Sequence, residues 1–199
     1  MSDRDDPLEN DRGDMVETED VPDDWTRLDT ETEYDNGWYE GGFDEFERPD
    51  GSSKRYYWAA LPPAVVIVAV DGDDVLFVEQ FRPTIRQTHL ELPAGIVEDG
   101  ETYAEAGRRE LREETGYDAG ELVVMQEVWA ATGVLCHRRG YVFATDLSFV
   151  GRDLDDGEFL TLERIPVEEA IDRAREVPAN DATIEGLLLA QVDGLLSTE

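Results

Sequence analysis

Three glutamates in the segment GIVEDGETYAEAGRRELREETGY, residues 95–117, have a spacing that suits a metal site. If residues 102–115 form a helix, Glu110, Glu113 and Glu114 stand at offsets of zero, three and four, which places their carboxylates on one face. Like charges at these spacings cost an isolated helix roughly 0.2–0.5 kcal/mol per pair. The face is therefore either solvated or bound to a cation, and hard ions such as Mg²⁺ bind through carboxylate oxygens, waters and substrate phosphates.

The residues around these glutamates have separate expected roles. Gly95 and Gly100 bracket the loop before the helix, where glycine lets a ligand approach the main chain and the loop can lend carbonyl oxygens to a metal. Gly116 follows the helix, where a left-handed cap is expected. Arg109 either orients one carboxylate or is an exposed surface arginine. The apolar stripe that docks the helix on a core is expected to comprise Ala104, Gly107 and Leu111.

The chain after residue 62 predicts an α+β domain. The apolar runs at 64–70 and 75–78, joined by a turn, predict two strands of a buried sheet. Asn180 and Asp181 are good N-cap residues for a final helix. The remaining expected elements are strands at 122–128, 141–144 and 159–162 and a helix at 167–175. Strands with a few helices and no regular βαβ repeat are typical of an α+β sandwich.

The amino-terminal region has a different composition. Residues 1–24 are rich in Asp and Glu and poor in apolar side chains, which predicts a disordered acidic tail. Residues 25–61 contain aromatic stretches separated by a Pro49-Asp50-Gly51 turn, which predicts a β-hairpin region. The main domain is then expected to span residues 62–199.

The net charge of −32 comes from 49 acidic and 17 basic residues spread along the chain. Such a chain repels itself in dilute buffer, but at ~1 M salt the Debye length shrinks to about 3 Å. We therefore predict a high-salt cytoplasm, as in extreme halophiles. An acidic surface for basic partners would instead predict acidic residues concentrated in one segment, and only the amino-terminal tail has such a segment. The charge also argues against binding to nucleic acid phosphates.

Other patterns exclude further classes of protein. The single cysteine, Cys136, allows no intrachain disulfide, and no Cys/His spacing suggests zinc. His89 and His137 form no recognisable nucleophilic set. No apolar run reaches the ~20 residues of a membrane span, and the amino terminus lacks a signal sequence. The sequence predicts a soluble, cytoplasmic protein that does not bind membranes.

Residues 95–117 resemble the Nudix hydrolase box at all of its defining polar and glycine positions. These are Gly95, Glu101, Arg109-Glu110-Leu111, Glu113-Glu114 and Gly116, followed by the apolar Tyr117. From about Trp38 to Ala190 the chain is similar to the ADP-ribose pyrophosphatase branch of that superfamily. The matches outside the box include Pro49-Asp50-Gly51, the strand at 64–70, Glu79-Gln80-Phe81-Arg82-Pro83, Glu91-Leu92-Pro93-Ala94-Gly95, Gly157-Glu158-Phe159 and Asp181-Ala182-Thr183-Ile184.

The resemblance implies a fold, a cofactor and a reaction. The fold is the α/β/α Nudix sandwich with a mixed sheet, preceded here by the hairpin region. The cofactor is Mg²⁺, with Mn²⁺ as the alternative, and the reaction is hydrolysis of a nucleoside diphosphate linked to another moiety. In this branch the substrate is often ADP-ribose, giving AMP and ribose 5-phosphate. These enzymes are commonly homodimers whose amino-terminal hairpins complete the partner's site.

The resemblance also implies roles for individual residues. The metal ligands would be Glu110, Glu113, Glu114 and the backbone carbonyl of Ala94. The catalytic candidates are Glu113 and Glu158 as alternative general bases, with Arg109 beside them. The substrate-binding candidates are Arg82, Gly95, Gly133, Trp38, Tyr57 and Trp58. Arg82 would contact phosphate or else form a surface salt bridge, and the three aromatic residues would stack on adenine or else belong to the hairpin core.

One departure from the family leaves the substrate open. Where many members have Ser-Pro-Gly, this chain has Ala131-Thr132-Gly133, and a basic loop with His137, Arg138 and Arg139 follows. That loop would contact an extra phosphate or pair with nearby acids. NADH, a dinucleoside polyphosphate or a nucleotide-sugar are alternative substrates. A non-catalytic nucleotide sensor is the alternative function, although such proteins usually have eroded box carboxylates and an added DNA-binding domain.

Overall fold

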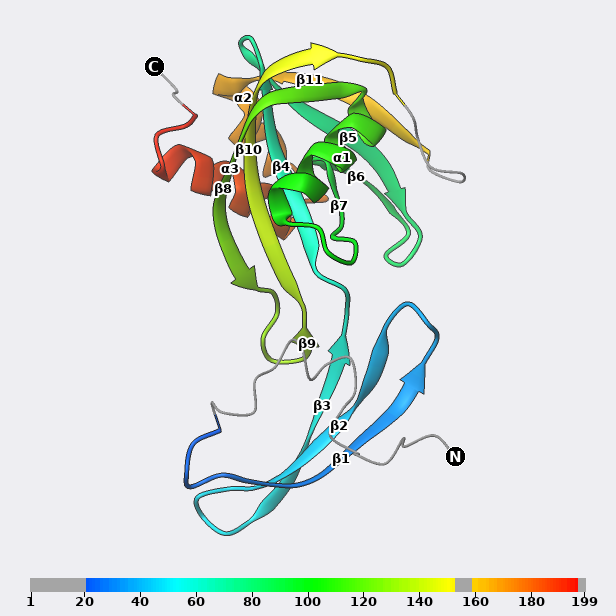
Figure 1. Ribbon diagram of the computed structural model, residues 1–199, viewed down its shortest axis with the longest axis vertical. Coiled ribbons are helices and arrows are strands. Elements are labelled where there is room, and N and C mark those ends of the chain that lie inside the picture. The colour runs from blue at the N-terminus through cyan, green and yellow to red at the C-terminus, as the bar shows by residue number, and fades with distance from the viewer. Residues whose placement is uncertain (1–20, 153–158, 197–199) are drawn as a thin grey trace. The chain divides into compact units, whose positions relative to one another are not determined.

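The computed structural model describes residues 21–152 and 159–196 (Figure 1). Their contacts divide them into two units. The first comprises the described residues up to Pro62 together with Trp129–Arg138, and the second comprises Pro63–Val128 and the described residues from Arg139 onward. Residues 1–20 of the predicted acidic tail and the predicted base Glu158 lie outside the described residues.

The first unit is a small sheet with the strand order β1-β2-β3-β9. Its strands are β1 (Thr26–Asp35), β2 (Glu40–Glu47), β3 (Ser53–Ala60) and β9 (Leu135–Cys136). The first three form an antiparallel meander, and β9 pairs in parallel with β3. The expected hairpin is therefore a three-stranded meander, to which a segment distant in sequence adds a fourth strand.

Aromatic side chains stabilise this meander. The rings of Trp25, Phe46 and Tyr56 contact one another with centroids 6.0–6.1 Å apart. Phe43 is fully buried. The turn between β2 and β3 is closed by a 2.8 Å hydrogen bond from the Gly51 N–H to the Arg48 carbonyl, and Gly51 has φ 77°, which glycine adopts without strain. The predicted turn at this point is confirmed.

The second unit is built on a mixed sheet. Within the described residues its strands are β4 (Ala64–Asp71), β5 (Asp74–Arg82), β6 (Gln87–Glu91), β7 (Ala94–Ile96), β8 (Tyr117–Trp129), β10 (Arg138–Phe149) and β11 (Leu160–Pro166). The order is β11-β5-β4-β10-β8, with β6 on β5 and β7 on β4. β10 runs parallel to β4, whereas β5 and β7 run antiparallel to it. The sequence did not predict the short strands β6, β7 and β9.

Helices cover both faces of this sheet (Figure 1). The helices are α1 (Tyr103–Thr115), α2 (Val167–Ala174) and α3 (Asp181–Val192). Because side chains alternate along a strand, β4 supplies Val66 and Val68 to the core under α2 and α3, and Val65, Ile67 and Ala69 to the core under α1. The predicted α/β/α sandwich is confirmed.

Helix α1 has capping residues at both ends. At its start, Thr102 and Glu105 form a capping box, in which the Thr102 hydroxyl accepts from the Glu105 N–H and the Glu105 carboxylate accepts from the Thr102 N–H. At its end Gly116 adopts φ 81°, and its N–H donates to the Arg112 carbonyl. The helix and its Gly116 cap agree with the sequence prediction, whereas the Thr102 cap was not predicted.

The buried side of α1 differs from the predicted stripe at one position. Gly107 and Leu111 are buried as expected, but Ala104 is only half-buried and Ala106 is fully buried. A Cβ at Gly107 would lie 3.5 Å from the Val142 and Val65 side chains. The helix therefore comes close to the sheet at this turn, and the neighbouring Ala106 is covered as well.

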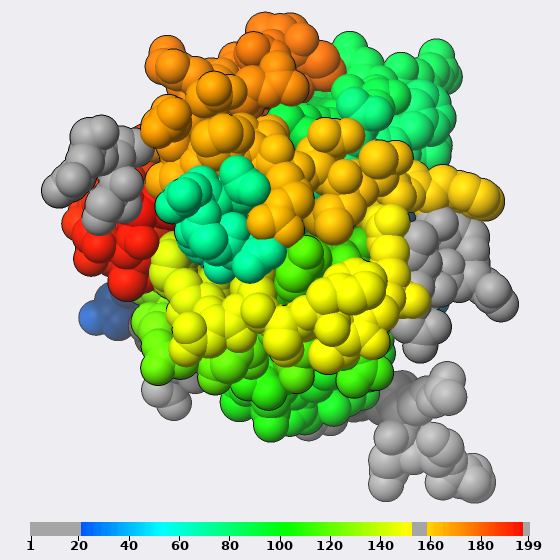
Figure 2. Space-filling model, turned by 90° about the horizontal axis from the view of Figure 1, so that it is seen from above, coloured from blue at the N-terminus to red at the C-terminus, as the bar shows by residue number. Residues whose placement is uncertain are grey.

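An arginine in β11 connects three segments at one end of the sheet. The Arg164 guanidinium donates to Asp71 Oδ2 at 2.7 Å, to Asp74 Oδ2 at 3.2 Å and to the Tyr117 hydroxyl at 2.9 Å. Figure 2 looks onto this end, where the teal β4–β5 turn lies beside β11 and α2 in orange.

In the described part of the chain, no helix has the length and apolar content to cross a membrane.

Replacing the N-cap residue should destabilise the second unit. Thr102→Ala removes the hydroxyl that accepts from Glu105, so the free energy of unfolding is expected to fall by about 1 kcal/mol. Thr102→Ser keeps the hydroxyl and serves as the control. Urea unfolding followed by circular dichroism measures both. Equal losses in the two variants would contradict the capping role.

Candidate metal centre

Helix α1 and strand β7 bring the predicted metal ligands together. Glu110, Glu113 and Glu114 lie on α1, and Ala94 lies in β7, which pairs with β4 beneath the helix. The side chain of Glu114 is buried, and its Oε2 accepts a 3.1 Å hydrogen bond from the Ala94 N–H. Ala94, whose carbonyl was predicted as a ligand, is thereby fixed beside the acidic face of the helix.

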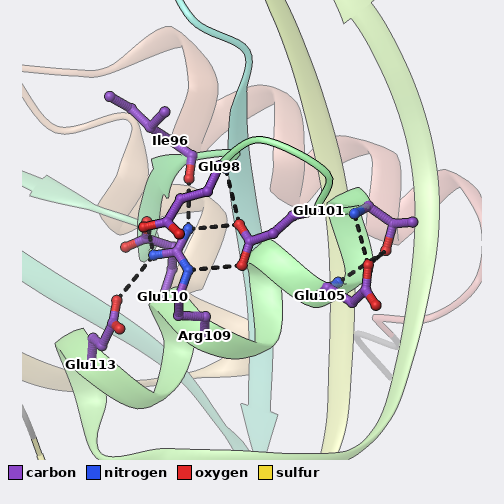
Figure 3. A network of polar contacts seen from close by, with 8 residues as sticks. Ile96, Glu98, Glu101, Glu105, Arg109, Glu110 and Glu113 are labelled. Carbon is purple, nitrogen blue, oxygen red and sulfur yellow. Dashed lines mark hydrogen bonds and ion pairs between the residues drawn. The ribbon is translucent and has the colours of Figure 1, made fainter.

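Arg109 links the acidic residues of this site (Figure 3). Its Nε and Nη2 donate to the two carboxylate oxygens of Glu101 at 3.0 and 2.9 Å. Its Nη1 donates to Glu110 Oε1 at 2.8 Å and to Glu113 Oε2 at 3.1 Å, and its Nη2 also donates to the Ile96 carbonyl at 2.8 Å. A guanidinium has five N–H donors. All of them are therefore used in contacts within the site.

These contacts change the ionisation of both partners. Hydrogen bonds to Glu101, followed by those to Glu110, raise the pKa of Arg109 above its ordinary value. The hydrogen bond from Arg109 lowers the pKa of Glu101, and the backbone N–H of Glu98 adds to this effect. Arg109 therefore stays charged and holds the loop before α1 against the helix. Its predicted role of orienting a carboxylate agrees with these contacts.

Gly95 makes room for Glu110. A Cβ on Gly95 would lie 2.0 Å from the carboxyl carbon of Glu110 and 2.0 Å from its Oε1, so no larger residue fits without moving that carboxylate. The sequence assigned Gly95 to the substrate. The structure shows that its missing side chain lets Glu110 approach the backbone of β7.

The donor set suits a hard divalent ion. Three carboxylates from one helix face lie beside main-chain atoms of β7, and oxygen ligands of this kind bind Mg²⁺ or Mn²⁺. Within the described residues, however, no group of three or more His, Cys, Asp and Glu side chains is arranged to hold an ion as it stands. The Arg109 guanidinium lies between Glu110 and Glu113 and offsets their repulsion.

Arg82 makes an ion pair rather than being left open. Its Nε donates to Glu91 Oε2 at 3.0 Å, and Asn180 Nδ2 donates to the other oxygen, Oε1, at 3.1 Å. Glu91 is only 4% exposed, whereas the Arg82 side chain is 43% exposed. The salt-bridge alternative is therefore present in the structure, and an exposed part of the guanidinium remains available for a phosphate.

The other predicted substrate contacts belong to the first unit. Trp38 and Tyr57 are 57% and 58% exposed, whereas Trp58 is 8% exposed. A Cβ at Gly42 would lie 2.9 Å from the Trp58 ring, so this indole packs inside its own sheet. The space around Gly133 is open, since a Cβ there would meet no atom within 4 Å. Trp38 and Tyr57 are the exposed stacking candidates, and the ligand contacts of all four residues stay predictions.

The predicted basic loop is partly strand, because Arg138 and Arg139 begin β10, and these two arginines have different partners. The Arg138 guanidinium lies over the Trp129 ring, 4.8 Å from its centroid. In the second unit, Arg139 Nη1 lies 3.7 Å from Asp181 Oδ2 and 3.6 Å from Glu185 Oε2. For Arg139, pairing with acids is therefore what the structure shows.

Sequence reasoning named Asn180 only as a helix cap and Glu91 only within a family match, assigned neither a role in the site, and set His89 aside. Glu91 and His89 are both buried in β6, and neither ring nitrogen of His89 has a hydrogen-bond partner among the described residues. A glutamate between two leucines was the available signal for Glu91, because a charge in such a context must be paired when it is buried.

Comparisons with known proteins show which chains this one is similar to. The NUDIX domain family matches residues 60–187. The ADP-ribose pyrophosphatase of Bacillus subtilis (strain 168) is 32% identical over 139 residues, which cover 67% of this chain and 75% of that protein. A methanol dehydrogenase activator of Bacillus methanolicus is 29% identical over 136 residues, covering 67% and 74%. A crystal structure of an ADP compounds hydrolase has the same fold, with a TM-score of 0.78 at 24% identity, covering 86% of this chain and 95% of that one.

Adding one methyl group at Gly95 should weaken metal binding. In Gly95→Ala the new Cβ displaces Glu110, so the affinity for Mn²⁺ and Mg²⁺ is expected to fall about 10- to 100-fold, the range found when an orienting contact is lost. Calorimetric titration measures this affinity. Gly107→Ala is the control, because its Cβ meets only ordinary contacts at 3.5 Å or more. Unchanged affinity in Gly95→Ala would refute the role of this glycine.

Glu101 should make stability depend on pH. Arg109 lowers the folded-state pKa of Glu101 below its unfolded value, about 4.3. The carboxylate therefore stabilises the fold above that pH, and this contribution is lost as the pH falls through the lower folded-state pKa. Glu101→Gln should unfold more easily than wild type at roughly pH 6, with the difference shrinking toward roughly pH 3. Urea unfolding across this range tests it, and a pH-independent difference would contradict it.

Proposed function

The chain belongs to the NUDIX domain family, and on that premise we propose that it hydrolyses ADP-ribose to AMP and ribose 5-phosphate. As a Nudix pyrophosphohydrolase it breaks the diphosphate bond of a nucleotide. The observation that carries the proposal is the set of three glutamates on α1: Arg109 holds Glu110 and Glu113, and the Ala94 N–H of β7 holds Glu114. The ADP-ribose pyrophosphatase of Bacillus subtilis supports the choice of substrate.

Nudix hydrolases use divalent metal ions, and we assign Mg²⁺ to this site, with Mn²⁺ as the alternative. Glu110, Glu113, Glu114 and the carbonyl of Ala94 would hold it. When bound, such an ion neutralises phosphate charge, lowers the pKa of a bound water and orients the leaving group. The chemistry of these oxygen ligands supports the assignment.

The protein's own residues have defined tasks in this reaction. Arg109 orients Glu110 and Glu113 and offsets their repulsion, because it donates to both. One oxygen of Glu113 is used by Arg109, and its second oxygen, Oε1, is our candidate to take the proton from the attacking water. Glu158 is the other candidate base, from sequence alone. The exposed part of the Arg82 guanidinium would bind a phosphate oxygen of the substrate.

Several parts of the proposal rest on sequence alone. We propose that Trp38 or Tyr57 stacks on adenine, that Gly133 lies at the substrate, and that two copies of the chain form a homodimer. The charge of −32 supports activity in molar salt, as in the cytoplasm of a halophile. NADH, a dinucleoside polyphosphate or a nucleotide-sugar stay alternative substrates.

Product analysis tests the proposed reaction. Purified protein in molar KCl with Mg²⁺ should release AMP and ribose 5-phosphate from ADP-ribose, and EDTA should abolish this release. Glu113→Gln should lower kcat by roughly 10²- to 10⁴-fold, the usual contribution of a general base. Glu168→Gln removes the same charge from an exposed position on α2 and should leave kcat unchanged.

The other outcomes of this assay are equally informative. The alternative nucleotides should be assayed beside ADP-ribose. Turnover of one of them in its place would keep the reaction and change the substrate. Binding without hydrolysis across all of them would refute the enzyme and leave the nucleotide sensor.

A further inference from the structure

We propose that Asn180 is a positioning residue, which orients Arg82 toward the substrate diphosphate through the buried carboxylate of Glu91. The inference rests on the proposed function for the identity of the ligand. Its structural part is a continuous set of hydrogen bonds from the first turn of α3 to the guanidinium of Arg82 in β5.

The amide of Asn180 does two things at once. Its Oδ1 accepts a 3.0 Å hydrogen bond from the Thr183 N–H and so caps α3. Its Nδ2 donates at 3.1 Å to Glu91 Oε1, a residue far away in sequence. Any good capping side chain could make the contact with Thr183. The contact with Glu91 requires a donor such as the amide nitrogen of asparagine.

Glu91 connects Asn180 to Arg82. Its carboxylate is buried, with Oε1 bound by Asn180 and Oε2 bound by Nε and Nη2 of Arg82. A buried charge is tolerated when both of its oxygens are bonded, and removing one partner leaves the other charge uncompensated. The position of Glu91 therefore depends on both neighbours, and the orientation of Arg82 depends on Glu91.

Arg82 is held on one edge and open on the other. Glu91 engages Nε and Nη2, and in the described part of the chain no hydrogen bond involves Nη1. A guanidinium fixed along one edge presents its remaining N–H groups in a defined direction, which suits the oxygens of a phosphate. Such preorganisation lowers the cost of binding because the long side chain is already ordered.

The hydrogen-bonded set Asn180, Glu91 and Arg82, here called the relay, includes a residue that lies close in sequence to the candidate metal centre. Glu91 precedes Ala94 by three residues, so their Cα atoms are at most about 11 Å apart. The Ala94 N–H is bound by Glu114, and the Leu92 N–H donates to Thr183 Oγ1 at 3.1 Å. The first turn of α3 thus holds both Glu91 and Leu92. The residue that anchors Arg82 therefore lies three positions from Ala94, the predicted main-chain ligand of the metal.

Replacing Asn180 by Asp separates the two jobs. Asp and Asn are equally good N-caps, so Asn180→Asp keeps the cap of α3 while it loses the donor and faces Glu91 with a second negative charge. Asn180→Ser also keeps a capping oxygen and loses the donor without adding charge. A role confined to the helix cap would leave both variants close to wild type.

Steady-state kinetics with ADP-ribose and Mg²⁺ in molar KCl is the first measurement. We expect KM to rise about tenfold in Asn180→Asp, the loss typical of one hydrogen bond to a charged group, and less in Asn180→Ser, with kcat within about twofold of wild type. Arg82→Ala should raise KM at least as much. Adding Asn180→Asp to Arg82→Ala should raise it no further, because both substitutions act on one contact.

Nuclear magnetic resonance tests the relay without any turnover. The Arg82 Nε–H resonance, assigned by its absence in Arg82→Ala, should be protected from solvent exchange in wild type and lose that protection in Asn180→Asp. Equal protection in the two proteins, or an unchanged KM in Asn180→Asp when Arg82→Ala raises it, would overturn the positioning role. If wild type hydrolyses no nucleotide, the proposed function fails, and the resonance still decides whether Asn180 orients Arg82.

Discussion

The site depends on one guanidinium. Arg109 places its five N–H groups on two carboxylates of its own helix, one carboxylate of the preceding loop and one main-chain carbonyl. Without this cation, three glutamates on one helix face would repel one another, and Glu101 and the Ile96 carbonyl would lose their contacts with α1. Because anionic partners and partial burial strengthen each of these contacts, this arginine sets the arrangement of the carboxylates on α1.

Close approach of backbones completes the arrangement. Gly107 lets α1 come near the sheet, and Gly95 lets Glu110 lie against β7, so neither position tolerates a large side chain. The two cores on opposite faces of β4 then fix the helix and the strand that carry the ligands. The packed core holds the acidic face in place, and Arg109 offsets the repulsion between Glu110 and Glu113.

Features that depend on residues close in sequence could be predicted, whereas contacts between residues distant in sequence could not. Local signals gave correct predictions: Gly116 caps α1, Asn180 caps α3, and the apolar runs form β4 and β5. Pairings between distant residues were missed, since nothing beside Leu135 indicates that it pairs with Ala59, and nothing beside Arg82 indicates Glu91 and Asn180 as partners. The motif identified the carboxylates. The contact between Gly95 and Glu110 could not be predicted from the sequence, because glycine has no side chain whose type would indicate a partner.

The short strand β9 has a consequence for the order in which the chain can fold during synthesis. It completes the first sheet by pairing Leu135 and Cys136 with Ala59 and Ala60, although β4 to β8 lie between them in sequence. A ribosome therefore delivers the meander long before the strand that covers its edge. Until then, the Ala59–Ala60 end of β3 carries unpaired backbone groups, the kind of edge that invites pairing with another chain. Acidic side chains on the emerging polypeptide offer electrostatic protection during that interval.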